Sequence, residues 1–285
     1  VKAKLVREGD GVFSFRPDKP WENDSLHLVA LDAPDDCGNR GTETLAFFCG
    51  RRIEKGLVTL RDDGMTLIDG KSFFPIGIYS VHRCAANSNS IENAFRQLKD
   101  AGFNTVHTYD WKRGESYSEY QDMAEKYGMR LLNNPVSPLP KTVANERTRP
   151  NMLAWYLADD ASKRMTPEQL RMRSLTVKRY DNAHLTAQAD SLGSDYRTRY
   201  ADFIGSTDVF LPELYTACGS RPNGYEVLFV DYQVRAVFRE LREAGVVKGV
   251  WPILQQFKGW TNEVGTAVTE VVKGTTGDLT FYAVW

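Results

Sequence analysis

Residues 90–110 read SIENAFRQLKDAGFNTVHTYD and contain the unit from which the fold is built. The first part of this stretch is amphipathic, with Ser90 as a cap and Gly102 as a stop, and it predicts a helix over 90–101. The apolar run that follows predicts a strand over 105–110. Such alternation of helices and short apolar strands is typical of a parallel sheet covered by helices.

The alternation extends from residue 73 to the end of the chain. The predicted strands are 73–81, 105–110, 130–133, 152–157, 185–189, 208–214, 250–255 and 279–284. The predicted helices are 90–101, 117–127, 166–180, 195–204, 225–244 and 261–272. This content predicts an α/β protein with a (β/α)8 TIM barrel. A doubly wound open sheet is the alternative, but its first turn usually carries G-x-G-x-x-G, which residues 82–87 lack.

The N-terminal part of the chain has a different pattern. Residues 1–70 contain short alternating apolar runs separated by turn residues, which predicts a small β-rich accessory module. We therefore expect two domains, with the barrel over 71–285. Because the sequence stops at Trp285, on the eighth predicted strand, we expect the last barrel helix to be absent from the chain.

Composition excludes several classes of protein. The 36 Lys and Arg residues against 37 Asp and Glu residues give a net charge of −1, which argues against a nucleic-acid partner. No apolar run is long enough to cross a membrane, and we expect no membrane partner. The oligomeric state is left open. An extracellular or periplasmic location is expected, although the polar N-terminal residues show no signal peptide.

The cysteines and histidines indicate no metal centre. Cys37, Cys49, Cys84 and Cys218 form no C-x-x-C pair and have no His at zinc-finger spacing. Cys37 and Cys49 lie in a polar region and either form a disulfide or remain free thiols. H-E-x-x-H and G-x-S-x-G are also missing from the sequence, which disfavours zinc and serine hydrolases. We expect no cofactor.

Active sites of barrels lie at the C-terminal ends of the strands. The residues that end the predicted strands are carboxylates, amides and aromatic residues: Tyr109, Asp110, Trp111, Asp159, Asp160, Gln188, Asp190, Glu213, Tyr215, Gln255, Trp260 and Trp285. Carboxylates and amides bind sugar hydroxyls, aromatic faces stack on pyranose rings, and two carboxylates can cleave a glycosidic bond. One of Asp159 and Asp160 could instead cap the next helix.

Three stretches resemble glycoside hydrolase barrels of clan A, such as families 2, 5 and 42. They are DGKSFFPIG at 69–77, LKDAGFNTV at 98–106 and NMLAWYLADD at 151–160. The resemblance covers residues 65–285 and implies a barrel that hydrolyses glycosides. It places Asp160 at the position of the acid/base Glu, with a side chain that is one methylene shorter.

The chain also departs from this family where a nucleophile is expected. The resemblance implies a Glu at the end of strand 7, but residues 251–257 read WPILQQF and contain no carboxylate. An amide cannot form a glycosyl ester. Glu213 is the best substitute from the residues alone, with Asp190 and Glu263 in reserve.

These observations predict a glycoside hydrolase that acts on an oligosaccharide or polysaccharide. Asp160 is the expected general acid and Glu213 its partner, while Tyr109, Gln188, Tyr215, Gln255 and Trp285 shape the subsite. The two predicted strands are two apart, which favours a wide carboxyl gap and inversion. The rival hypotheses are a glycan-binding barrel without catalysis and an enzyme of different chemistry on the same scaffold.

Overall fold

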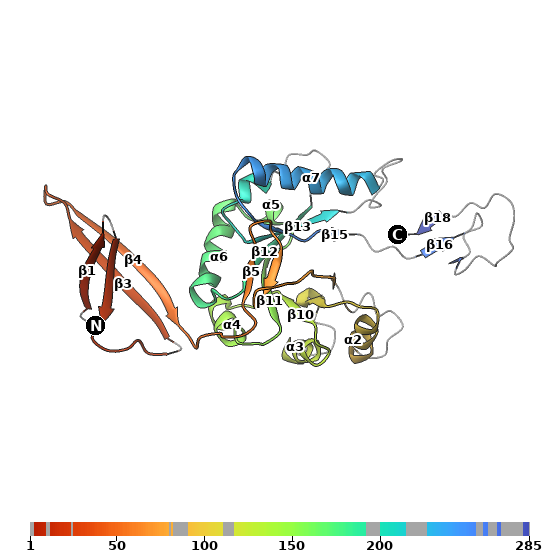
Figure 1. Ribbon diagram of the computed structural model, residues 1–285, viewed down its shortest axis with the longest axis horizontal. Coiled ribbons are helices and arrows are strands. Elements are labelled where there is room, and N and C mark those ends of the chain that lie inside the picture. The colour runs from red at the N-terminus through yellow and green to blue at the C-terminus, as the bar shows by residue number, and fades with distance from the viewer. Residues whose placement is uncertain are drawn as a thin grey trace.

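A parallel β-sheet with helices packed against it forms the centre of the protein (Figure 1). The computed structural model describes residues 3–9, 12–23, 25–79, 81, 91–110, 117–191, 200–214, 227–254, 259–261, 267–268 and 282–284. The order of the sheet is β14-β13-β12-β11-β10-β9-β8, and β15 also pairs with β13. Its strands are β8 (Gly77–Ile78), β9 (Thr105–His107), β10 (Arg130–Asn133), β11 (Met152–Ala158), β12 (Leu185–Ser191), β13 (Val209–Leu214), β14 (Gly249–Val250) and β15 (Ile253–Leu254).

This sheet is a curled, partial barrel, with β8 and β14 at its edges among the described strands. The α/β class is as predicted, but the described strands do not close into a barrel, because β14 and β15 both pair with β13 and the predicted eighth strand is not in this sheet. The segment predicted as strand eight instead forms β18 (Tyr282–Val284), antiparallel to β16 (Gly259–Thr261). Short runs rich in β-formers can pair with any free strand edge, so an apolar pattern does not determine the partner.

Two further predictions near the C-terminus were wrong. The strand expected over 250–255 is divided into β14 and β15, because Pro252 has no N–H to donate to the ladder. The helix expected over 261–272 is contradicted by β17 (Ala267–Val268), which pairs with β16. The valine-rich composition of this stretch suits a strand as well as a helix.

The helices follow the sequence prediction more closely. They are α2 (Ile91–Asp100), α3 (Tyr117–Lys126), α4 (Leu139–Glu146), α5 (Ala161–Arg164), α6 (Pro167–Tyr180) and α7 (Val227–Glu243), with 3-10 turns η1 (Thr108–Asp110) and η2 (Tyr200–Phe203). Helix α6 begins at a capping box, in which Thr166 Oγ1 accepts from the backbone N–H of Gln169 and the Gln169 side chain accepts from that of Thr166. No helix in the described ranges is long and apolar enough to cross a membrane.

Side chains alternate along the strands and form one apolar cluster on each face of the sheet. Trp155, Leu157 and Phe210 pack toward the helices, in a cluster with residues of α6 and α7. Tyr156, Ala187 and Leu211 face the concave side, in a cluster that also contains Val58 and Ile68. The latter two belong to β5 (Val58–Leu60) and β6 (Thr66–Ile68), which form a small sheet with β7 (Lys71–Ser72).

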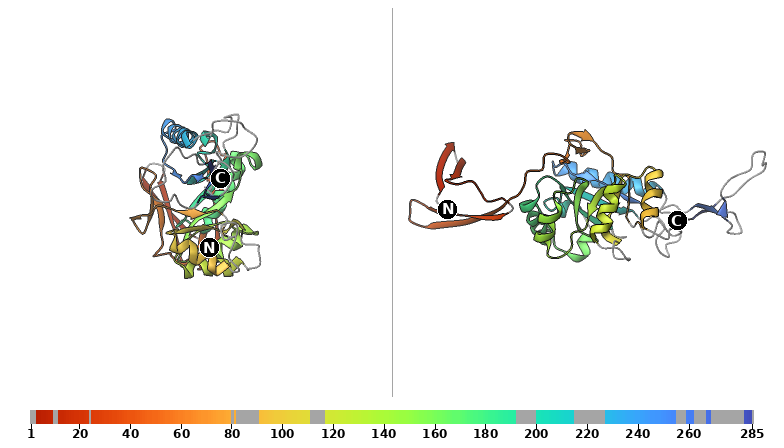
Figure 2. Two further views of the ribbon diagram at one scale, coloured as in Figure 1. Left: turned by 90° about the vertical axis from the view of Figure 1, so that its right-hand side faces the viewer. Right: turned by 90° about the horizontal axis from the view of Figure 1, so that it is seen from below.

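The first 49 residues contribute two antiparallel hairpins. These are β1 (Ala3–Gly9) with β2 (Val12–Pro17), and β3 (Ser25–Pro34) with β4 (Arg40–Cys49). They lie at the opposite end of the molecule from the β16–β18 sheet (Figure 1 and Figure 2). Cys37, in the β3–β4 turn, and Cys49, at the far end of β4, are both free thiols. The domain boundary at residue 70 stays a prediction.

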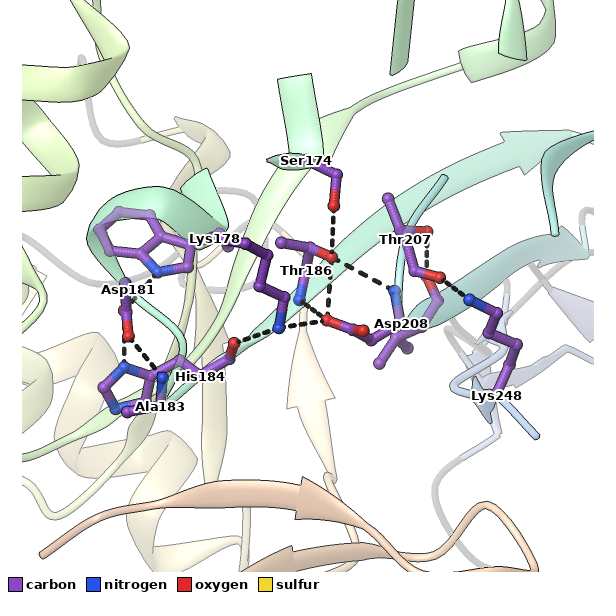
Figure 3. A network of polar contacts seen from close by, with 11 residues as sticks. Ser174, Lys178, Asp181, Ala183, His184, Thr186, Thr207, Asp208 and Lys248 are labelled. Carbon is purple, nitrogen blue, oxygen red and sulfur yellow. Dashed lines mark hydrogen bonds and ion pairs between the residues drawn. The ribbon is translucent and has the colours of Figure 1, made fainter. Parts of the chain in front are cut away.

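A buried polar network joins the N-terminal ends of three strands to α6 (Figure 3). Asp181 accepts hydrogen bonds from Trp155 Nε1 (2.7 Å), His184 Nδ1 (2.7 Å) and the backbone N–H of Ala183 (2.9 Å). Lys178 lies 2.7 Å from Asp208 and donates to the carbonyl of His184. Because active sites of barrels lie at the opposite, C-terminal ends of the strands, this network serves the stability of the fold.

Candidate functional site

The candidate site lies at the C-terminal ends of the strands and is centred on the carboxylate of Asp159. Three tyrosine hydroxyls donate to it: Tyr79 to Oδ1 at 2.6 Å, Tyr156 to Oδ1 at 2.9 Å and Tyr109 to Oδ2 at 3.0 Å. Tyr79 follows β8, Tyr109 lies in η1 after β9, and Tyr156 lies on β11. Parallel strands end at one edge of a sheet, so residues far apart in sequence converge here.

Glu213, near the end of β13, faces the same carboxylate. The Glu213 residue is only 8% exposed. Burial, together with the charges of Asp159 and Asp160, raises the pKa of Glu213 to about 7. Burial would also raise the pKa of Asp159, but the three tyrosine hydroxyls outweigh it, and the pKa is lowered. The pair thus holds one proton near neutral pH, on Glu213.

Asp160 and Asp190 lie beside this pair. Asp160 has a left-handed backbone (φ 49°) at the start of α5, and its carboxylate binds Lys163 Nζ at 2.9 Å. Asp190 accepts from both the backbone N–H (2.9 Å) and the hydroxyl (2.8 Å) of Ser162, so it, rather than Asp159 or Asp160, caps the first turn of α5. Burial raises the pKa of Asp190, with a further contribution from the charge of Asp160.

The structure therefore brings Asp159, Asp160, Asp190, Glu213 and Tyr109 to one rim, and their catalytic and binding roles stay predictions. Gln188, which was predicted to bind substrate, is not among them: its side chain is fully buried and accepts from Thr207 Oγ1 at 3.0 Å. Its neighbours Ala187 and Ala189 face the concave side, so Gln188 must face the opposite side. Position at a strand end does not determine which face a side chain occupies.

The other predicted site residues stay predictions. Trp111, Tyr215, Gln255 and Trp285 lie outside the described residues. Asp110 in η1 and Trp260 in β16 belong to described elements, but their side chains lie outside the described part of the chain. Within that part, no three His, Cys, Asp or Glu side chains lie together as metal ligands would.

Sequence reasoning did not assign roles to Tyr79, Tyr156 and His107. Tyr79 and His107 lie at predicted strand ends, and this position was the available signal. Tyr156 lies inside a strand that is buried along its whole length. An unbroken apolar run gives no alternation from which the concave face can be identified, so this tyrosine could not be found from the sequence.

Comparison with known proteins gives a similar fold in solved glycosidase structures. No protein-family model and no curated protein matches the sequence. A β-glucuronidase from Lactobacillus rhamnosus is 13% identical, with a TM-score of 0.50, and the match covers 85% of this chain and 45% of that one. A GH2 β-galacturonidase from Eisenbergiella tayi is 13% identical, with a TM-score of 0.47 and coverage of 80% and 42%.

The chain spans less than half the length of these two structures. The likeness to the Lactobacillus rhamnosus enzyme supports an α/β, barrel-like fold and by itself defines no activity. The resemblance to families 5 and 42 stays a prediction, and the proposals below rest on the site.

The raised pKa of Glu213 predicts a pH-dependent stability. The folded chain binds this proton more tightly than the unfolded chain, whose Glu titrates near 4.5. The contribution of the Glu213 proton to the free energy of unfolding is therefore complete below pH 4.5, and it is lost as the pH rises through about 7. In urea unfolding, the free energy of unfolding should be lower at pH 8 than at pH 5 by about 2–4 kcal/mol. This difference should disappear in Glu213→Gln. The control Glu168→Gln, on the exposed face of α6, should show the same difference between pH 5 and pH 8 as the wild-type protein. If Glu213→Gln also shows this difference, Glu213 does not carry the proton.

Proposed function

We propose that the protein is a glycoside hydrolase whose site lies at the C-terminal rim of the sheet, with Glu213 as the proton donor. The supporting observation is the Asp159–Glu213 pair, in which adjacent carboxyls have their pKa values moved in opposite directions. Such separation is typical of acid/base pairs in active sites. Glu213 retains its proton up to about neutral pH and can transfer it to the oxygen of a departing sugar.

Asp159 is not the second catalytic carboxylate in this proposal. Both of its oxygens already accept hydrogen bonds, Oδ1 from Tyr79 and Tyr156 and Oδ2 from Tyr109, so it is poorly placed to activate water or attack a sugar. Asp160 is the better candidate, because it lies on the next residue of the rim and its side chain is 28% exposed.

This assignment exchanges the roles expected from the sequence. Glu213 donates the proton, and Asp160 activates water on the opposite face of the sugar ring. Strands β11 and β13 are separated by β12, which favours the wide separation of an inverting enzyme. Tyr109, with 39% of its surface exposed, offers a ring for contact with the sugar.

The second candidate is a glycan-binding barrel without catalysis. The observation that favours it is the sequence Gln255–Gln256 at the end of the predicted strand 7, where the resembled family has its nucleophile. Incubation with a panel of nitrophenyl glycosides separates the two. We expect turnover of at least one glycoside, with an inverted first-formed anomer by NMR; saturable binding without turnover would support the binding protein instead.

A further inference from the structure

Four aromatic rings pack beneath the Asp159 carboxylate. The His107 ring stacks on Tyr79, with centroids 4.8 Å apart and planes at 13°, and meets Tyr156 edge to face at 4.2 Å. Tyr109 stacks on His107 at 5.6 Å. These four residues, called here the aromatic cluster, come from the position after β8 and from β9, η1 and β11, and they fix one another by ring contact.

The aromatic cluster meets most of the hydrogen-bonding capacity of Asp159. An ionised carboxylate offers about four lone-pair sites. Three are met by the hydroxyls of Tyr79, Tyr109 and Tyr156. Arg164, 3.6 Å from Oδ2, adds a positive charge. The hydroxyls of Tyr79 and Tyr156 lie only 3.0 Å apart, so both converge on the single oxygen Oδ1.

We propose that the aromatic cluster is a positioning device that holds Asp159 as an ionised acceptor and leaves the proton of the carboxyl pair on Glu213. The inference deepens the proposed function and rests on it for the catalytic use of that proton. None of the four rings needs to touch the reacting atoms, because each acts through the Asp159 carboxylate.

His107 is the structural support of this device. Its Nδ1 accepts the backbone N–H of Tyr109 at 3.1 Å, and this bond fixes the proton of the neutral ring on Nε2. The ring is 2% exposed, and burial lowers the pKa of His107 to about 3, so it stays neutral wherever Glu213 titrates. A neutral, buried ring can orient Tyr109 without adding a charge that would compete for Asp159.

Several charged and titratable groups face the carboxyl pair, and each is a competing influence on its protonation. They are Tyr79, Tyr109, Tyr156, Asp160, Lys163, Arg164, Asp190 and Tyr200. Of these, only the three tyrosines of the aromatic cluster donate hydrogen bonds to Asp159 among the described contacts. Their removal therefore tests the device separately from the surrounding charges.

The test is a titration of the full chain without any substrate, which reports on the device whether or not a glycoside is cleaved. Protein labelled with 13C at the side-chain carboxyls of Asp and Glu is titrated by NMR, with Asp159→Asn and Glu213→Gln to assign the two signals. Because a carboxylate that accepts two or three hydrogen bonds can titrate about two pH units lower, Tyr79→Phe and Tyr109→Phe should each raise the pKa of Asp159 by about one. Glu213 should then be more ionised at pH 6.

Tyr117→Phe is the matched control, because this half-buried hydroxyl donates to Asn133 rather than to Asp159. The proposal is overturned if Tyr79→Phe and Tyr109→Phe change the Asp159 titration no more than Tyr117→Phe does. His107→Phe retains an aromatic ring but loses the acceptor for Tyr109, so it should move the titration in the same direction as Tyr109→Phe.

The double variant His107→Phe/Tyr109→Phe distinguishes positioning from an independent effect. If His107 acts through Tyr109, the double variant titrates like Tyr109→Phe alone; additive changes would overturn the role of His107. Failure of the proposed function gives a different pattern, in which the titrations move as expected but the wild-type chain cleaves no glycoside.

Discussion

Replacement of Glu213 by Gln is expected to lower kcat/KM for a cleaved glycoside by about 10²–10⁴-fold, the range for loss of a general acid. The amide has nearly the shape of the carboxyl group but cannot supply its acidic proton to the leaving oxygen. In the wild-type protein the activity should fall as the pH rises above about 7, where Glu213 ionises. Measurement of kcat/KM from pH 5 to 9 checks both statements.

The controls for this experiment separate chemistry from folding. Glu168→Gln makes the same substitution on α6, where the carboxylate binds Arg171 at the surface, and should leave kcat/KM within about two-fold. Asp160→Asn should also lower kcat, by about 10²-fold or more, if Asp160 activates water. Unchanged turnover in Glu213→Gln, with a wild-type circular dichroism spectrum, would remove Glu213 from the mechanism.

The parallel strands were the most predictable part of the fold. The strand expected over 130–133 is β10 with the same bounds, and those around 152 and 185 differ only at their ends. These strands are buried on both faces, so their apolar runs stand out from the helices between them. Prediction failed after residue 250, where Pro252 interrupts a strand and short β-forming runs have several possible partners.

The candidate site was predictable in position but not in detail. Parallel topology alone brings the residues after β11 and at the end of β13 to one edge, which is why Asp159, Asp160 and Glu213 were found. Which of them touch depends on side-chain direction: Glu213 lies on the same face as Leu211, toward Tyr156 and Asp159. That face is defined only once the sheet curls, and the proton was expected on Asp160 because the family resemblance places that residue at the position of the acid/base Glu.

The largest expected effect on stability is at Asp181, at the opposite end of the strands. Asp181 is fully buried, and its carboxylate accepts three hydrogen bonds, from Trp155, Ala183 and His184. These hydrogen bonds outweigh burial and lower the pKa of Asp181, so the group is ionised in the folded chain at neutral pH. Removal of the carboxylate leaves two buried side-chain donors and a backbone N–H without their acceptor (Figure 3).

Asp181→Ala should therefore lower the free energy of unfolding by about 3–5 kcal/mol, because three buried donors lose their acceptor and each unpaired donor costs about 1–3 kcal/mol. Urea unfolding at pH 7 measures the loss. Asp231→Ala is the matched control, because Asp231 pairs with Arg235 on the exposed surface of α7 and should cost less than about 1 kcal/mol. Equal losses in the two variants would show that the Asp181 hydrogen bonds add nothing beyond a surface pair, and the stability of this end of the sheet would have to come from apolar packing around Trp155.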